Sequence, residues 1–210
     1  MLNKINVQES YYSWWKNIDK TILILILSFF IAGLFFSLVS TSLIASDRLN
    51  TNSYYFFIKH LVFILMGLLT MFSFSLIHES YLVKISMFLF ILTLLLLFLV
   101  PFFGVEIKGS KRWLDLPFLP RFQPVELIKP FYIVILATLL NNDKYNLYFK
   151  YLTTLFLIVP IILLLISQPD VGQSMLIIFT WLALIFVSGI NLFIFFGLFA
   201  IFISILTYLI

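Results

Sequence analysis

The last forty residues of the chain, 171–210, contain no charged side chain. As one α-helix this run would be about 60 Å long, twice the ~30 Å thickness of the hydrocarbon core of a bilayer. We therefore expect the polar residues Ser188, Gly189 and Asn191 to divide it into two membrane spans. The chain is 63% hydrophobic and only 10% charged, whereas soluble domains carry roughly 25% charged residues. Because a backbone in lipid must satisfy its own hydrogen bonds, this composition predicts an all-α, polytopic membrane helix bundle.

Further apolar windows that lack Asp, Glu, Lys and Arg cover residues 21–46, 60–78, 85–105 and 151–169. Each is close to the ~20 residues that a spanning helix needs. The remaining window, 130–142, is too short to span unless its helix begins near Pro124, which places Glu126 and Lys129 at the membrane boundary. The sequence thus predicts seven spans, which we expect to form a single transmembrane domain over residues 1–210.

Composition also excludes several classes of function. The chain has no cysteine, so disulfides, thiolate metal sites and cysteine nucleophiles are ruled out. The net charge of +4 is common among membrane proteins, and no nucleic-acid-binding motif accompanies it. No cluster of metal-ligating residues is evident, so no metal or other cofactor is predicted, and dependence on a divalent cation is left open.

Residues 104–130 form a charged island between apolar segments. They hold five of the thirteen basic residues of the chain and three of its nine acids, namely Lys108, Lys111, Arg112, Arg121, Lys129, Glu106, Asp115 and Glu126. Ionisable groups at membrane depth are costly and are commonly functional, and several cations at the interface suit a phosphate or pyrophosphate headgroup. The alternative is a solvated loop in which Glu126 and Lys129, three residues apart on one helical face, form a local ion pair.

A second polar segment, residues 167–173, links two of the spans. Asp170 and Gln173 have the spacing of a capping box, which favours a structural role for Asp170 at the start of the next helix. The sharper alternative is that Asp170 pairs with a cation of the island. The distribution of basic residues does not orient the chain in the membrane, so an island on either side is compatible with it.

Two motifs resemble the signature of the shape, elongation, division and sporulation (SEDS) family. The first contains Gly104, Lys108, Gly109, Ser110, Arg112 and Trp113, followed by Arg121, Gln123, Pro124, Glu126 and Lys129. The second contains Gln168, Pro169, Asp170, Gly172 and Gln173. The member that acts in division is resembled by residues on both sides of the first span, namely Trp14, Trp15 and Asp19 before it and Asp47, Arg48, Phe57, Ile58, Lys59 and His60 after it. Val125 departs from the pattern, because the family has a small residue there.

The resemblance implies a fold of about ten spans, each of ~20 residues, and a multi-pass protein of the bacterial inner membrane, placed at the division septum. It implies a glycosyltransferase that polymerises lipid II, an undecaprenyl-pyrophosphate-linked substrate, beside a class B penicillin-binding protein and other division proteins. It places residues 104–123 in a basic loop outside the cytoplasm. Substrate contact would then fall to Arg121, Lys129, Lys108, Arg112 and Lys111, with Glu126 holding Lys129. Structural motif positions would be Gly104, Gly109, Trp113, Gln123, Pro124, Pro169, Asp170 and Gly172.

The resemblance also places the catalytic aspartate of the family beyond Ile210, so we expect this chain to be the N-terminal part of an enzyme and to be inactive alone. The alternative is a non-catalytic translocator of lipid II, or a scaffold of the division machinery. A translocator should carry charged residues inside its spans, and six of the seven predicted spans have none in their interiors.

Overall fold

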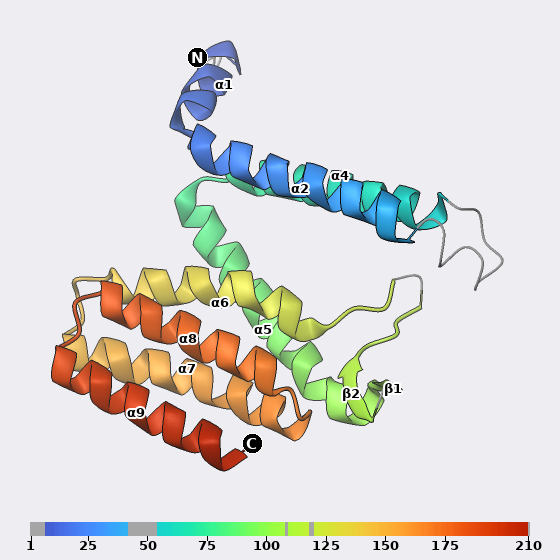
Figure 1. The fold of residues 1–210 in the computed structure, drawn as a ribbon. Coiled ribbons are helices and arrows are strands. Elements are labelled where there is room, and N and C mark those ends of the chain that lie inside the picture. Colours follow the sequence, from blue (N-terminus) through green and yellow to red (C-terminus); the bar gives the residue numbers. More distant parts are fainter. Residues whose placement is uncertain (1–6, 42–53, 108, 118–119, 210) are drawn as a thin grey trace. The chain divides into compact units, whose positions relative to one another are not determined.

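The computed structural model describes the backbone of residues 7–41, 54–107, 109–117 and 120–209 (Figure 1). Its contacts divide the chain into two units, Met1–His78 and Glu79–Ile210, each of which is described by itself. The expectation of one transmembrane domain over residues 1–210 stays a prediction.

The first unit contains α1 (Val7–Asn17), α2 (Lys20–Thr41) and α4 (Tyr55–Ser75). Helix α2 begins after Asp19, whose carboxylate accepts hydrogen bonds from the amides of Thr21 (2.9 Å) and Ile22 (3.1 Å). These bonds satisfy two of the amides that a helix start leaves free. The aromatic residues ahead of the first span lie on α1, and the indole of Trp14 donates to Ser75 Oγ at the end of α4 (3.1 Å).

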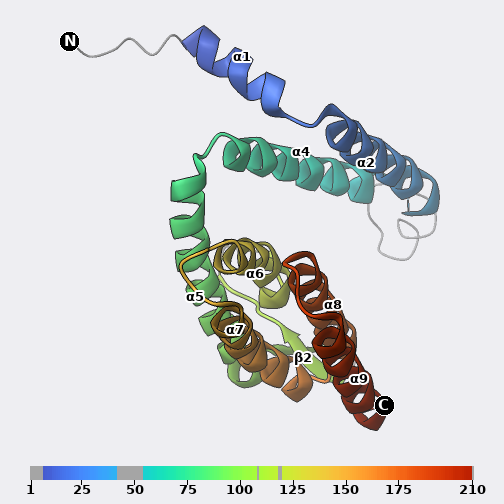
Figure 2. The same ribbon diagram turned by 90° about the vertical axis from the view of Figure 1, so that its left-hand side faces the viewer.

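The second unit contains five helices and one hairpin within its described residues: α5 (Glu79–Phe103), β1 (Val105–Ile107), β2 (Ser110–Trp113), α6 (Pro124–Leu140), α7 (Leu147–Ser167), α8 (Val171–Val187) and α9 (Leu192–Leu209). Figure 2 shows α6 flanked by α5, α7 and α8 within this unit. The buried core is apolar and comes from these four helices, with Leu97, Ile128, Leu136, Ile161 and Ile185 fully enclosed. The packing of α6 places its charged first turn beside the start of α8.

Each of the seven predicted spans is a helix in the structure, so the all-α bundle is confirmed. Helices α2, α4, α5 and α7 are long and apolar enough to cross a membrane by length and composition, and α8 and α9 contain shorter apolar helices. Helices α4, α5 and α7 begin four to six residues ahead of the charge-free windows. Helix α7, for example, begins at Leu147 rather than near Tyr151, because the Asn146 side chain accepts from the amide of Phe149 (2.8 Å) and caps an earlier turn.

Strands β1 and β2 form an antiparallel hairpin that the sequence analysis did not predict. Glu106 lies opposite Lys111, and Gly109 at the turn has φ of +80°, a conformation that side chains disfavour. Gly104 joins the hairpin to α5. A Cβ built on Gly104 would lie 2.4 Å from the carbonyl oxygen of Val100, so the backbone there leaves no room for a side chain. Two of the predicted motif glycines thus shape this hairpin.

Candidate functional site

Helix α6 carries the predicted pair Glu126 and Lys129 on its first turns. Gln123 is the N-cap in extended conformation and Pro124 is the first helical residue, as predicted. Proline suits this position because its missing amide has no partner there in any case. Pro124 and Val125 are buried, and Val125 packs in the apolar core with only 2% of its surface exposed. Because Pro124 and Val125 fix one side of the first turn in the core, the orientation of the opposite side, which carries Glu126 and Lys129, is also fixed.

The Lys129 ammonium lies between two partners. It is 2.6 Å from Glu126 Oε2 and donates to Gln173 Oε1 at 2.9 Å. Gln173 also donates from Nε2 to Glu126 Oε1 at 2.7 Å. The ion pair predicted from the spacing is confirmed, and it is part of a closed cluster of three side chains from α6 and α8. Gln173 belongs to the second motif, but the sequence analysis gave it only a capping role.

Arg112 on β2 binds the turn between α7 and α8. Its guanidinium donates to the carbonyl oxygens of Gln168 (3.3 Å) and Pro169 (2.6 Å), and its Nη1 lies 3.5 Å from Asp170 Oδ1. The carboxylate of Asp170 makes no cap bond to α8. The capping-box interpretation of Asp170 is therefore wrong, and the alternative pairing with a cation of the island is confirmed. The Asp170 carboxylate could have accepted from the free backbone amides at the start of α8. It pairs instead with the Arg112 guanidinium, because a hydrogen bond to a full positive charge is stronger than one to a neutral amide.

Gln168 anchors the same α7–α8 turn to helix α5. Its side chain is buried and its Nε2 lies 3.4 Å from the carbonyl oxygen of Leu97 on α5, to which it donates. Gln168 was quoted in the second motif without a predicted role, and its polar neighbours Ser167 and Asp170 gave no sign that it would face the core. The turn that presents Gln173 is thus held by α5 on one side and by the hairpin on the other.

Arg121 forms its own ion pair within the island. Its Nη2 and Nε lie 2.6 and 3.2 Å from Asp115 Oδ2, and both side chains are about half exposed. The backbones of Leu114 and Phe122 exchange two hydrogen bonds, of 2.9 and 3.2 Å, which close this segment into a loop. An exposed pair of this kind contributes little to stability. Among the described residues it takes up two of the five N–H groups of the guanidinium, and the other three can meet further acceptors.

The remaining predicted residues are less closely tied to this cluster. Lys108 lies outside the described residues. Lys111 is exposed and, with Glu106, Gln168 and Pro169, lines a small polar pocket of about 260 Å³ between the hairpin and the α7–α8 turn. Trp113 is half-buried on β2. A Cβ built on Gly172 would meet no atom within 4 Å, so packing does not require a glycine there.

The chemistry available at the cluster follows from the donors that remain. A lysine ammonium has three N–H groups, and Glu126 and Gln173 account for two of those of Lys129. The side chain of Lys129 is 17% exposed, so the third donor and the charge are accessible from one side. A largely buried cation with a fixed orientation suits an anionic group, and its low-dielectric surroundings strengthen that attraction.

A profile of the family described as "Cell cycle protein", comprising FtsW, RodA and SpoVE, matches residues 19–210. The chain belongs to this family. The SEDS resemblance of the two motifs is thereby confirmed, and the chain is a multi-pass bacterial membrane protein of the FtsW, RodA and SpoVE type.

The relatives of this SEDS chain include two proteins named probable peptidoglycan glycosyltransferase FtsW. One from Coxiella burnetii is 31% identical over 91% of this chain and 50% of its own length. One from Wigglesworthia glossinidia brevipalpis is 32% identical over 90% of this chain and 51% of its own. The chain thus spans about half the length of these curated relatives.

Solved structures show the same fold. The crystal structure of the D255A mutant of RodA from Thermus thermophilus has a TM-score of 0.63 and 29% identity, over 85% of this chain and 59% of that one. A structure described as structural coordination of polymerization and crosslinking by a peptidoglycan synthase complex has a TM-score of 0.63 and 29% identity, over 83% of this chain and 53% of that one. Both agree with the fold class predicted from the sequence.

Proposed function

We propose that this chain is the donor-binding part of a peptidoglycan glycosyltransferase that polymerises lipid II during cell division. Membership of the SEDS family and the names of the relatives support the reaction class. The likeness to relatives named FtsW favours division over elongation. Residues 104–123 would then lie outside the cytoplasm, where the disaccharide of lipid II is polymerised.

The observation that carries the proposal is the Lys129 ammonium, held by Glu126 and Gln173 with one donor left over. When the glycan of lipid II is transferred, the glycosidic bond to the acceptor forms while the bond between the sugar and the pyrophosphate breaks. The leaving pyrophosphate takes the electron pair of that bond and gains negative charge. A fixed cation stabilises such a charge without reorganising, which is the main electrostatic contribution in many enzymes. At 4 Å and an effective dielectric of 20, one charge pair contributes about 4 kcal/mol before desolvation.

Arg121 would add a second cation to the site. Its guanidinium has N–H groups that could bind the pyrophosphate, either beside Asp115 or after the pyrophosphate has displaced Asp115. Arg112 has another role in this proposal. Its donors go to Gln168, Pro169 and Asp170, so it positions the α7–α8 turn and, through that turn, Gln173. Lys108 and Lys111 would contribute positive charge at the mouth of the site without a defined partner.

The partner we propose is a class B penicillin-binding protein at the division septum of the inner membrane, together with other division proteins. This rests on the similarity to a chain from a peptidoglycan synthase complex and on the FtsW relatives. The catalytic aspartate that the resemblance implies would lie in the half of the relatives that this chain does not match.

The test is binding of fluorescent lipid II to the chain in nanodiscs. Lys129→Gln keeps a polar N–H donor on a side chain one atom shorter and removes the charge, and loss of a charge-assisted hydrogen bond should weaken binding about 10-fold or more. Lys144→Gln is the matched control, because Lys144 lies exposed in the turn between α6 and α7. Unchanged affinity for Lys129→Gln would refute the donor-site assignment. Lipid II binding without glycan polymerisation by the native gene product would favour a translocator or scaffold.

A further inference from the structure

Helix α1 meets the other two helices of the first unit at the end where α2 begins and α4 ends. The chain changes direction after α1, and the Asp19 carboxylate starts a new helix there by accepting from the amides of Thr21 and Ile22. Figure 1 shows α1 running across the direction of α2 rather than continuing it. Since α2 and α4 are long and apolar enough to cross a membrane, a helix that runs across them at this end lies along the membrane surface.

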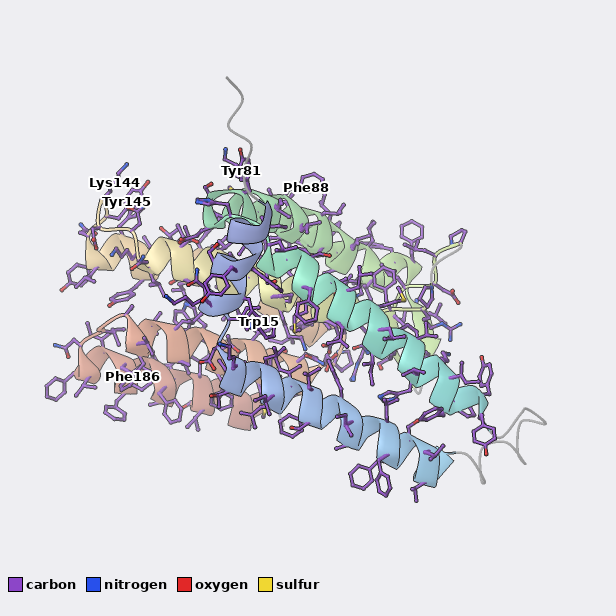
Figure 3. All side chains as sticks on the ribbon, turned by 90° about the horizontal axis from the view of Figure 1, so that it is seen from above. Trp15, Tyr81, Phe88, Lys144, Tyr145 and Phe186 are labelled. Atoms are coloured by element: carbon purple, nitrogen blue, oxygen red, sulfur yellow. The ribbon has the colours of Figure 1, made fainter. Side chains whose placement is uncertain are left out.

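Trp14 holds α1 at this level of the unit. Its indole Nε1 donates to Ser75 Oγ at 3.1 Å, and its ring lies edge-on to that of Phe72, with the two centroids 6.1 Å apart. Both partners belong to the last turn of α4. Tyr12 and Trp15, three residues apart, share a different face of α1, and they are 71% and 40% exposed. Figure 3 labels Trp15 on α1 beside the start of α2. One face of α1 is therefore fixed against α4, and another is exposed.

Two lysines adjoin this exposed face. Lys16 lies one helical turn beyond Tyr12, Lys20 is the first residue of α2, and both lysines are exposed. Neither forms an ion pair with a residue whose side chain the structure describes. The carboxylate of Asp19, the acid between them, accepts instead from two backbone amides of α2. The exposed face thus combines aromatic rings with two cations.

The kind of partner follows from this combination. Tryptophan and tyrosine concentrate at the level of lipid headgroups, and lysines near a membrane are attracted by anionic phospholipids. The core of a protein–protein interface, by contrast, is depleted of lysine. The face also adjoins the apolar surface of α2, where Ile22 is 56% exposed. We propose that α1 is a membrane-surface helix whose Lys16, together with Lys20, binds anionic phospholipid headgroups. Tyr12 and Trp15 enter the interfacial layer beside them. This surface does not depend on the proposed lipid II site.

Amide hydrogen exchange of the chain in nanodiscs, followed by mass spectrometry, tests the proposal. The amides of α1 should exchange about 5- to 25-fold more slowly in discs that contain phosphatidylglycerol than in discs of phosphatidylcholine alone, because each lysine contributes about 5-fold at an anionic surface. Lys16→Gln removes one of the two charges and should reduce this difference about 5-fold. Trp15→Ser should speed the exchange of α1 in both kinds of disc, since insertion of the ring needs no lipid charge.

Lys59→Gln is the matched control, because Lys59 is also exposed but lies at the other end of α4 from Ser75. Exchange of α1 in this variant should follow that of the wild type. Unchanged exchange of α2 and α4 shows that each variant remains folded. Equal exchange of wild-type α1 in the two kinds of disc overturns the proposal and would leave the exposed face to a protein partner. The proposal is also overturned if Lys59→Gln reduces the lipid-dependent difference as much as Lys16→Gln does.

Discussion

Arg112, on the second strand of the hairpin, lies 3.5 Å from the carboxylate of Asp170, fifty-eight positions further along the chain (170 − 112). Asp170 is almost fully buried, and the same guanidinium accounts for two carbonyl oxygens of the α7–α8 turn. The pair therefore joins the two family motifs at a point next to Gln173, which reaches the Lys129 ammonium.

Replacing Arg112 by alanine should destabilise the fold by about 2 kcal/mol, because the buried Asp170 carboxylate and two carbonyl oxygens lose their donor. Thermal or denaturant unfolding of the purified chain measures this. In a double-mutant cycle with Asp170→Asn, the two losses should be less than additive. Fully additive losses would contradict the pairing. Arg112→Lys should recover only part of the stability, since an ammonium lacks the forked geometry of the guanidinium.

Replacing Gln173 by leucine should weaken lipid II binding about 3- to 10-fold, which corresponds to one or two ordinary hydrogen bonds. The physical reason is that Lys129 then keeps only Glu126 as a partner and loses its fixed orientation. The nanodisc binding measurement described above is the readout. Thr180→Val serves as the control, because Thr180 lies on the same helix and its hydroxyl donates only to the Leu176 carbonyl oxygen. Equal effects of both variants would show that the loss is not specific to the cluster.

Substitutions of Arg121 and Asp115 should change the affinity for lipid II in opposite directions. If Arg121 binds the pyrophosphate, Asp115 competes with the substrate for the guanidinium. Asp115→Asn should then tighten lipid II binding, and Arg121→Ala should weaken it, each by about 3-fold or more at low salt. Both effects should diminish as salt is added. If the pair only holds the loop closed, both variants should weaken binding together, and the ligand role of Arg121 would be wrong.

Lys150 is a buried cation at the start of α7. Its ammonium donates to the carbonyl oxygen of Leu140 at the end of α6 (2.9 Å) and lies 3.9 Å from Asp143. Lys150→Met should lower the free energy of unfolding by about 1–2 kcal/mol, because the Leu140 carbonyl loses a charged donor while the apolar stem is kept. Lys144→Met should have no measurable effect on stability. Lipid II binding should remain normal in both variants, because this turn lies at the other end of α6 from Lys129.

The two motif glycines Gly104 and Gly172 should respond differently to alanine. Gly104→Ala forces a Cβ against the carbonyl oxygen of Val100, so the α5–hairpin junction must move and the unfolding temperature should fall by several degrees, corresponding to roughly 1–3 kcal/mol. Gly172→Ala meets open space and lies in the first turn of α8, where alanine is the better helix former. It should leave stability unchanged or slightly higher. A stability loss in Gly172→Ala equal to that of Gly104→Ala would contradict this account.

The sequence by itself determined the features that depend on local chain geometry. Seven apolar segments became helices because lipid leaves a backbone few other ways to satisfy its hydrogen bonds, and the α6 start at Pro124 follows from the fixed φ of proline. The ion pair of Glu126 with Lys129 follows from a spacing that places both on one helical face. Each of these requires only neighbours within a few residues.

Tertiary structure decided which charged groups meet across the chain. Gln173 lies 44 residues from Lys129 and 47 from Glu126, and the local sequence of Asp170 favoured a capping role over the pairing with Arg112 that the structure shows. The same holds for Lys150, whose partner Leu140 belongs to a different helix. A polar side chain in an apolar chain takes the strongest partner within reach, and only the packing of α5, α6, α7 and α8 determines which partners are within reach.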